Sequence, residues 1–232
     1  MKVIIQAGGE GTRLRPITYE IPKPLIPVKK RPVVGHIIDM LQKNGVEDIA
    51  MIVSEKHARD FDMWKAGETE DIRKKILIII EPKQSGTFGW IRNLKDWIAD
   101  ETFAVINGDT LLDTDVGKLK EFHDSHGKIG TLLLTRVPDP KHYGVIILDE
   151  KGGVVNFLYH PEHSPSNYIS AGFHIFTSDV FKYETEDDVM MIDDHLLPAL
   201  IKEKELIGIY IEGTRCYDCG TLERWEKAIK EW

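Results

Sequence analysis

The sequence has no long apolar run, only two cysteines and no excess of positive charge. No stretch approaches the ~20 apolar residues that span a membrane, so we expect no membrane partner. The start "MKVIIQAGG" turns polar after four apolar residues, so we expect no signal peptide and a cytoplasmic location. Cys216 and Cys219 are then expected to be reduced, and a single C-x-x-C is only a weak signal for zinc or redox chemistry. Histidines such as His123, His126 and His163 are expected to be surface or loop residues rather than metal ligands.

The net charge of −8 argues against a nucleic-acid partner, but the charge is unevenly distributed. Residues 1–31 contain seven Lys or Arg residues and only two acidic ones, whereas the rest of the chain is strongly acidic. A basic segment on an acidic protein favours a small polyanion as ligand. The 232 residues can bury a full core, and they show no repeat or linker, so we predict a single domain over residues 1–232.

Short β-rich runs alternate with helical stretches in the first half of the chain. Strands are predicted at "KVIIQA" (2–7), "DIAMIVS" (48–54), "KILIII" (75–80) and "TFAVIN" (102–107), and helices at about 34–44 and 89–100. This alternation favours βαβ units around a buried parallel sheet, and we expect Leu77–Ile80 to be a buried strand. After Gly127, four strand-like runs follow closely, which is typical of an antiparallel or mixed region, and a helix, a strand and a helix close the chain.

The first predicted strand leads into a glycine-rich segment, "QAGGEGTRLRP" (6–16). Leu14 stands where a dinucleotide-binding G-x-G-x-x-G has its third glycine, and no Gly-Lys-Ser/Thr of a Walker A loop is present. Glycines that expose backbone N–H groups, with Arg13 and Arg15 beside them, still suit a phosphate ligand. For this window alone, a glycine-rich turn without a ligand remains the alternative.

Two aspartates add to this picture. Asp109 in "NGDT" follows a predicted buried strand, where a carboxylate can reach into a crevice, although an aspartate there also suits a turn or a helix cap. Asp218 lies in "CYDCGT" near the end of the chain. Together with the basic glycine loop and Lys23 in "PKP", they form a set suited to Mg²⁺-assisted phosphoryl chemistry.

The segment "GGEGTRLRPIT…PKPLIPV" resembles the signature of the sugar-1-phosphate nucleotidyltransferases, also called nucleotide-sugar pyrophosphorylases. Further blocks follow in the family's order: Gly86-Thr87, "NGD" (107–109), "YGV" (143–145), "SNYISAG" (166–172) and "YDCGT" (217–221). The chain resembles a short form without a C-terminal β-helix. The resemblance implies the nucleotide-diphospho-sugar transferase fold, an α/β architecture with a Rossmann-like, mixed and mostly parallel sheet, helices on both faces and a small antiparallel sugar-binding region. Residues 1–126 would form the nucleotide-binding half and residues 127–232 the sugar-phosphate-binding half.

The resemblance also implies Mg²⁺-dependent transfer of a nucleotidyl group from a nucleoside triphosphate to a sugar 1-phosphate. Arg13 would stabilise the triphosphate and the departing pyrophosphate, Lys23 would bridge the reacting phosphates, and Asp109 and Asp218 would hold Mg²⁺. The implied nucleotide-binding residues are Ala7, Gly8, Gly9, Gly11, Thr12, Glu81, Gly86, Thr87 and Gly108, and those for the sugar phosphate are Gly144, His160 and Ser170. A homodimer is a possible assembly.

Substrate identity depends on three positions. Glu81 precedes Gly86 by five residues, where relatives read the base with Gln or Glu. Its carboxylate only accepts hydrogen bonds, which suits the donors of guanine and favours GTP, with a mannose-type sugar. Ser170 stands where many relatives have Asn. Tyr159-His160-Pro161 stands where relatives commonly have Glu-Lys-Pro. This leaves open a non-standard acceptor (a heptose, amino sugar or alcohol phosphate), another cation in place of the lysine, or a catalytically impaired binding subunit.

Overall fold

The computed structural model describes residues 1–159 and 161–232 and divides the chain into two compact units. Unit 1 comprises Met1–Gln84, Val105–Thr114 and Arg215–Trp232, and unit 2 comprises Ser85–Ala104 and Asp115–Thr214. Each unit is therefore built from segments that are distant in the sequence. In the part of the chain that the structure describes, no helix has the length and apolar character needed to cross a membrane.

Unit 1 is built on a sheet of parallel strands. Its strands follow the order β6-β1-β4-β5, where β6 is Phe103–Asn107, β1 is Lys2–Gln6, β4 is Ile49–Ser54 and β5 is Ile76–Glu81. The first two residues of β6 are assigned to unit 2 and the rest to unit 1. The β1–β4 and β4–β5 pairs are parallel, and their registers place Gln6 beside Ile52 and Ser54 beside Glu81. The carboxyl ends of three strands therefore lie at one edge of the sheet, and the predicted parallel arrangement is confirmed for these strands.

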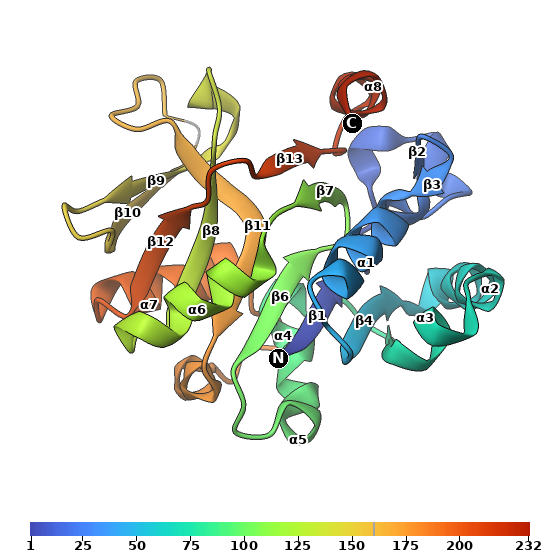
Figure 1. Cartoon of the computed structure of the whole chain (residues 1–232), viewed down its shortest axis with the longest axis horizontal. Coiled ribbons are helices and arrows are strands. Elements are labelled where there is room, and N and C mark those ends of the chain that lie inside the picture. The colour runs from blue at the N-terminus through green and yellow to red at the C-terminus, as the bar shows by residue number, and fades with distance from the viewer. Residues whose placement is uncertain (160) are drawn as a thin grey trace. The chain divides into compact units, whose positions relative to one another are not determined.

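Helices and short strand pairs complete unit 1 (Figure 1). Helix α1 (Val33–Lys43) buries Ile37, Ile38 and Leu41, as their helical spacing predicts, and packs against β7. The remaining helices are α2 (Ala58–Gly67), α3 (Glu70–Lys75) and α8 (Leu222–Glu231), with single-turn helices η1 (Thr12–Leu14), η2 (Ile17–Tyr19), η3 (Lys23–Leu25) and η4 (Glu55–His57). Two antiparallel pairs were not predicted: β2 (Pro27–Val28) with β3 (Arg31–Pro32), and β7 (Thr110–Asp113) with β13 (Arg215–Asp218).

The prediction that Leu77–Ile80 is a buried strand was wrong. These residues do form a strand, β5, but it stands at the end of the strand order, and Leu77 and Ile80 are 45% and 46% exposed. A central parallel strand is covered on both faces and on both edges, whereas an edge strand keeps one side free.

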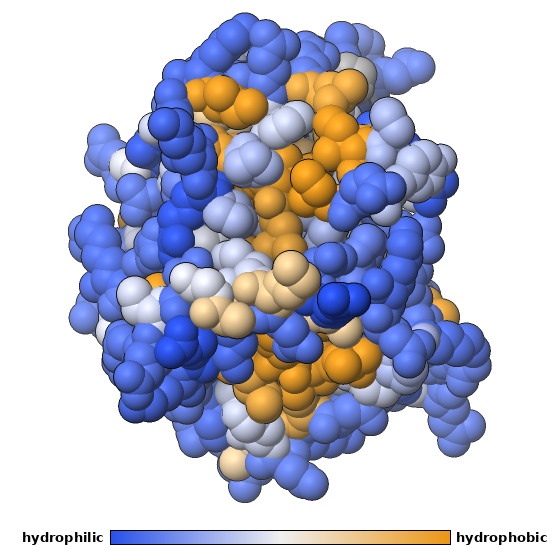
Figure 2. All heavy atoms as spheres, turned by 90° about the vertical axis from the view of Figure 1, so that its right-hand side faces the viewer, coloured by the Kyte–Doolittle hydropathy of each residue, from blue (hydrophilic) through white to orange (hydrophobic). Residues whose placement is uncertain are grey.

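Figure 2 shows one face of the molecule, on which apolar residues gather in patches between hydrophilic ones.

Unit 2 is a mixed sheet with short helices, as predicted for the region after Gly127. Its strands follow the order β10-β9-β11-β8-β12, where β8 is Gly130–Arg136, β9 is Gly144–Leu148, β10 is Val154–Tyr159, β11 is Tyr168–Phe176 and β12 is Leu206–Tyr210. All neighbouring pairs are antiparallel except β8–β12. The helices are α4 (Gly86–Gly89), α5 (Lys95–Ile98), α6 (Val116–His126) and α7 (Leu197–Lys202), with the turns η5 (Trp90–Leu94), η6 (Pro140–His142), η7 (Ser178–Tyr183) and η8 (Ile192–Leu196).

His123 corrects a second prediction, because it is neither a surface nor a loop residue. It lies on α6 with 3% exposure, and its Nδ1 is 2.8 Å from Thr131 Oγ1. Burial lowers the pKa of His123 to about 4, so the ring is neutral at pH 7 and packs as a core residue.

Candidate functional site

The glycine-rich loop continues β1 and is fixed at both of its ends. The Ala7 N–H donates to the Ile52 carbonyl at 2.8 Å, which keeps the start of the loop beside β4. Gly11 has a left-handed φ of 61°, and the Thr18 hydroxyl donates to its carbonyl at 2.8 Å. Gly9, between these points, is exposed, and a Cβ added there would meet nothing within 4 Å. The loop thus offers open, pre-shaped backbone, which suits an anion. Thr12 and Arg13 follow it in η1 and are also exposed.

Gly108 brings the turn after β6 against the end of β1. Its N–H donates to the Gln6 carbonyl at 2.8 Å, and a Cβ at this position would lie 2.7 Å from that same oxygen. Only glycine permits this approach. The next residue, Asp109, is thereby placed beside the root of the glycine-rich loop.

Lys23 lies between the two predicted metal-binding carboxylates. Its side chain is only 8% exposed, and Nζ forms an ion pair with Asp109 Oδ2 and lies 3.8 Å from Asp218 Oδ1. Asp218 reaches this position because β13 pairs with β7, which sets Asp218 opposite Thr110. The carboxylates are 33% and 30% exposed, so one side of this cluster faces solvent. Three of the four predicted catalytic residues therefore meet, although they are far apart in the sequence.

Two arginines flank Asp218. Arg224, in the first turn of α8, pairs through Nη1 with Asp218 Oδ2. Arg13, which follows the glycine-rich loop, also approaches Asp218. A Cβ added to Gly220 would lie 2.7 Å from Asp218 Oδ1 and 3.1 Å from Arg13 Nη2, so both side chains lie beside Gly220. Lys23, Arg13 and Arg224 face two carboxylates, which leaves a local excess of positive charge suited to a phosphate-bearing ligand.

Arg224 was not among the predicted site residues. A signal for it exists, since it stands three residues after Thr221, whose hydroxyl accepts the Arg224 N–H at 3.3 Å as the N-cap of α8. A long side chain in the first turn of a helix can fold back over the segment that precedes the helix. Here that segment carries Asp218.

The C-x-x-C cysteines are neutral thiols. Burial, followed by the nearby Asp218 carboxylate, raises the pKa of Cys216 and of Cys219 to about 12. Both thiols therefore stay protonated at neutral pH, whereas metal binding and redox exchange use the thiolate. Cys216 belongs to β13, and Cys219 follows the strand directly after Asp218 and is fully buried.

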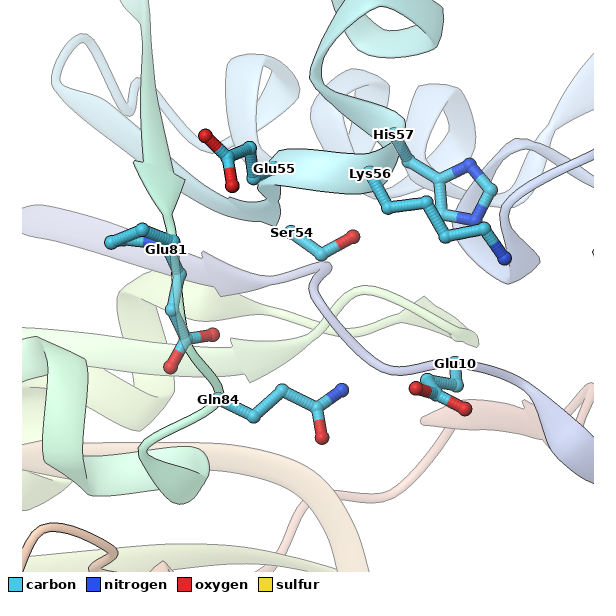
Figure 3. A pocket seen from close by; sticks show the side chains of 8 residues that line it. Glu10, Ser54, Glu55, Lys56, His57, Glu81 and Gln84 are labelled. Carbon is cyan, nitrogen blue, oxygen red and sulfur yellow. The ribbon is translucent and has the colours of Figure 1, made fainter.

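A pocket opens at the carboxyl ends of β1, β4 and β5 (Figure 3). It has a volume of about 330 Å³ and is lined by Glu10, Ser54, Glu55, Lys56, His57, Glu81, Pro82 and Gln84. Glu81 is 8% exposed, and a Cβ on Gly8 would lie 3.2 Å from its Oε2. The predicted base-reading residue is therefore next to the predicted phosphate loop.

Most of the residues that line this pocket were not predicted. Ser54, Lys56 and Gln84 add a hydroxyl, an ammonium and an amide to the pocket. The predicted parallel sheet could have indicated Ser54, because neighbouring parallel strands end side by side and Ser54 at the end of β4 pairs with Glu81 at the end of β5.

The other predicted nucleotide-binding residues, Gly86 and Thr87, belong to unit 2. They begin α4, which is tied to the segment before η8. The Phe88 and Gly89 N–H groups donate to the Met190 carbonyl at 2.8 and 3.0 Å, and the Ile192 N–H donates to Thr87 Oγ1 at 2.8 Å.

Unit 2 also contains the predicted sugar-phosphate residues that the structure describes. Gly144 and Ser170 are on neighbouring strands, where Val145 pairs with Ile169. A Cβ on Gly144 would collide with the ring of Phe157, which therefore packs directly on the backbone of β9. His160 lies outside the described residues. Its neighbour Tyr159 donates its hydroxyl to Asp194 Oδ1 at 2.7 Å.

Comparison with known proteins identifies the family of this chain. The profile of the family described as nucleotidyl transferase matches residues 2–231. The chain is 32% identical over 214 residues to the mannose-1-phosphate guanylyltransferase catalytic subunit beta of Drosophila pseudoobscura pseudoobscura, covering 91% of this chain and 57% of that protein. It is 31% identical over 223 residues to the mannose-1-phosphate guanylyltransferase of Mycobacterium tuberculosis (strain ATCC 25618 / H37Rv), covering 95% and 61%. The chain thus spans about three fifths of the length of these curated relatives.

A solved structure has the same fold. HddC from Yersinia pseudotuberculosis, complexed with GMP-PN, superposes with a TM-score of 0.83 at 26% identity over 99% of this chain and 98% of that one. The α/β fold predicted from the sequence is therefore confirmed, with a mostly parallel sheet in unit 1 and antiparallel strands in unit 2. On the family profile and these similarities together, the chain belongs to the nucleotidyl transferase family.

Proposed function

We propose that this protein transfers a nucleotidyl group from a nucleoside triphosphate to a sugar 1-phosphate, forming a nucleoside-diphosphate sugar and pyrophosphate. The observation that carries the proposal is the buried Lys23 ammonium between Asp109 and Asp218, beside an open glycine-rich loop. Family membership and the named activities of the relatives support it.

The chemistry needs little from the protein except position and charge. An oxygen of the sugar phosphate attacks the α-phosphorus while the bond to pyrophosphate breaks, so the nucleophile is already an anion and no side-chain base is required. The main obstacle is repulsion between two phosphate groups. Positive charge around the place where the two phosphate groups would meet is supplied by Lys23, Arg13 and Arg224.

The donor set also fits a magnesium ion. Asp109 and Asp218 supply oxygen ligands only, and among the described residues no group of three or more His, Cys, Asp or Glu side chains forms a complete metal cage. Mg²⁺ in phosphoryl-transfer sites is typically held by one or two carboxylates and completes its shell with substrate phosphates and water. When bound, the ion would neutralise phosphate charge. We propose that Asp109 and Asp218 hold it.

The pocket favours a guanine nucleotide. The Glu81 carboxylate can accept the N1–H and N2–H₂ donors that guanine presents on one edge. Ser54 and Gln84 add groups able to donate to its O6. The relatives are named as guanylyltransferases acting on mannose 1-phosphate, and the similar HddC structure was solved with GMP-PN. We therefore propose GTP and a mannose-type sugar 1-phosphate as substrates.

A different acceptor is the second candidate, because Tyr159-His160-Pro161 replaces the usual Glu-Lys-Pro. A heptose, amino sugar or alcohol phosphate would then take the place of mannose 1-phosphate. A homodimer and a cytoplasmic location remain predictions.

A panel of substrates tests the proposal. Pyrophosphate release is measured with Mg²⁺ for each common nucleoside triphosphate in combination with mannose 1-phosphate, a heptose 1-phosphate, an amino sugar 1-phosphate and an alcohol phosphate. We expect the highest kcat/KM with GTP and mannose 1-phosphate. Release with GTP and another phosphate would select the second candidate. Melting shifts with nucleotides but no release with any pair would instead identify a binding subunit.

Arg13 is expected to act mainly on the transition state. Pyrophosphate gains negative charge as it leaves, so Arg13→Ala should lower kcat by about tenfold or more while changing the nucleotide's Kd much less. Steady-state kinetics and equilibrium titration of the nucleotide measure the two effects. An unchanged kcat with a raised KM would show that Arg13 binds ground state and transition state equally.

Arg224 is expected to hold Asp218 in place. Its guanidinium occupies Oδ2 and leaves Oδ1 directed towards Lys23. Arg224→Ala should therefore raise the Mg²⁺ concentration that gives half-maximal rate, by about threefold to tenfold. Lys227→Ala, an exposed cation on the same helix, is the matched control. Equal Mg²⁺ dependence in both variants would contradict this role.

A further inference from the structure

The Ser170 hydroxyl oxygen contacts two polar groups of its own strand. The Gly172 N–H donates to Oγ at 3.1 Å, and His174 Nε2 lies 3.1 Å from the same atom. A bulge in β11 produces this arrangement, because Ser170 pairs with Leu134 and His174 with Leu132, so four steps on β11 oppose two on β8. Gly172, inside the bulge, has a left-handed φ of 72°.

The environment of His174 decides which ring nitrogen carries the hydrogen. The ring is 3% exposed, and burial lowers its pKa to about 4, so it is neutral at pH 7. Nδ1 is buried and has no hydrogen-bond partner among residues 1–159 and 161–232. A hydrogen on Nδ1 would be a buried donor without an acceptor, which is costly. An unprotonated Nδ1 also lacks a partner, but a buried N–H without an acceptor is the rarer case in folded proteins, which favours the hydrogen on Nε2, donated to Ser170 Oγ.

This tautomer fixes the direction of the serine hydroxyl. Oγ has two acceptor positions and one O–H, and the N–H groups of Gly172 and His174 fill both acceptor positions. The O–H must then donate elsewhere. With that tautomer the hydroxyl has no acceptor of its own within the described part of unit 2, and Ser170 as a residue is only half-buried.

We propose that His174 is a positioning residue, which orients the Ser170 hydroxyl so that it donates a hydrogen bond to the acceptor substrate. The identification of this ligand as a sugar 1-phosphate rests on the proposed function. Ser170 lies next to the Gly144–Val145 backbone, on the strand pair predicted to bind the sugar phosphate. An asparagine amide at position 170 would both donate and accept. The locked serine only donates, so the substrate must present an oxygen lone pair here, and an ammonium group is disfavoured.

The tautomer can be measured without any substrate. A long-range ¹H–¹⁵N correlation spectrum distinguishes a protonated from an unprotonated imidazole nitrogen, and His174→Gln identifies which ring signals belong to His174. His123, also buried and neutral, is the internal reference in unit 2. We expect His174 with Nε2 protonated and Nδ1 bare. A protonated Nδ1 would overturn the proposal whatever the activity.

Kinetics with substrate analogues tests the direction of the hydrogen bond. Ser170→Ala should raise the KM of the acceptor by about threefold to tenfold, as expected for one neutral hydrogen bond, and leave the KM of the nucleotide unchanged. His174→Phe should raise the acceptor KM by part of that factor. His174→Gln keeps an N–H donor and should raise it less. His123→Phe should leave the acceptor KM unchanged.

Deoxy analogues of the acceptor locate the partner oxygen. We expect one hydroxyl of the acceptor whose removal raises the acceptor KM of the wild-type protein but not that of Ser170→Ala. If no analogue distinguishes the two proteins, the hydroxyl does not contact the substrate and the proposal fails. If no acceptor is turned over at all, the proposed function falls. The nuclear magnetic resonance result then still decides the His174–Ser170 assignment, and titration with sugar phosphates shows whether Ser170 meets a ligand.

Discussion

Asp109→Asn is expected to lower turnover by about a hundredfold or more while the fold stays intact. The amide has the size of the carboxylate but no charge, so it weakens both the ion pair with Lys23 and any divalent cation held with Asp218. Asp109 is one-third exposed, and the substitution buries no new group. The loss should therefore appear in kcat rather than in stability.

Pyrophosphate release at several Mg²⁺ concentrations measures the effect, with the near-ultraviolet circular dichroism spectrum as the test of the fold. Asp113→Asn provides a matched control on β7, in the same segment of unit 1. Turnover within threefold of wild type for Asp109→Asn would exclude a direct role of this carboxylate. An equal loss in both variants would point to a general effect of charge on the segment.

The main elements of unit 1 were accessible from the sequence because they depend on local pattern. The apolar runs of β1 and β4 and the helical spacing of Ile37, Ile38 and Leu41 are set within a few residues. The glycine-rich loop follows from the same kind of reading. The residue types and the loop positions of Lys23, Asp109 and Asp218 already suggested one phosphoryl-transfer set, and the family resemblance supplied the role of each residue, since no spacing rule links residues so far apart.

Other features depend on contacts between distant segments and could not be predicted. β7 and β13 have four residues each, too few for a periodic signal, and form only because they pair with each other. The exposure of β5 depends on its place at the edge of the sheet, which composition does not reveal. The His174–Ser170 contact requires a bulge, whose position follows from the register of β11 against β8.

The units themselves are discontinuous in sequence. Unit 1 takes up Val105–Thr114 and Arg215–Trp232 in addition to the first 84 residues. These two segments carry Asp109, Asp218 and Arg224, so the candidate catalytic cluster lies within one unit although its residues span the chain. The sugar-side residues Gly144 and Ser170 belong to unit 2.

Lys23→Met is expected to have opposite effects on turnover and on metal binding. Loss of the ammonium removes charge that would offset repulsion between the reacting phosphates, so turnover should fall by about a hundredfold or more. In the free protein, however, Lys23 pairs with the same two carboxylates that are proposed to hold the metal. Without it, Asp109 loses its ion-pair partner while Asp218 keeps its pair with Arg224, so a divalent cation should bind the two carboxylates more tightly.

Titration with Mn²⁺ in the absence of nucleotide, followed by electron paramagnetic resonance, measures the binding of the metal directly. We expect a lower Kd for Lys23→Met than for wild type, and a larger rise in melting temperature on adding metal, because the ion then replaces a missing counter-charge. Asp218→Asn combined with Lys23→Met is the control, and it should lose the gain. Weaker or unchanged metal binding in Lys23→Met would show that the ammonium and the metal do not share these carboxylates. The role of Lys23 would then be confined to the substrate phosphates.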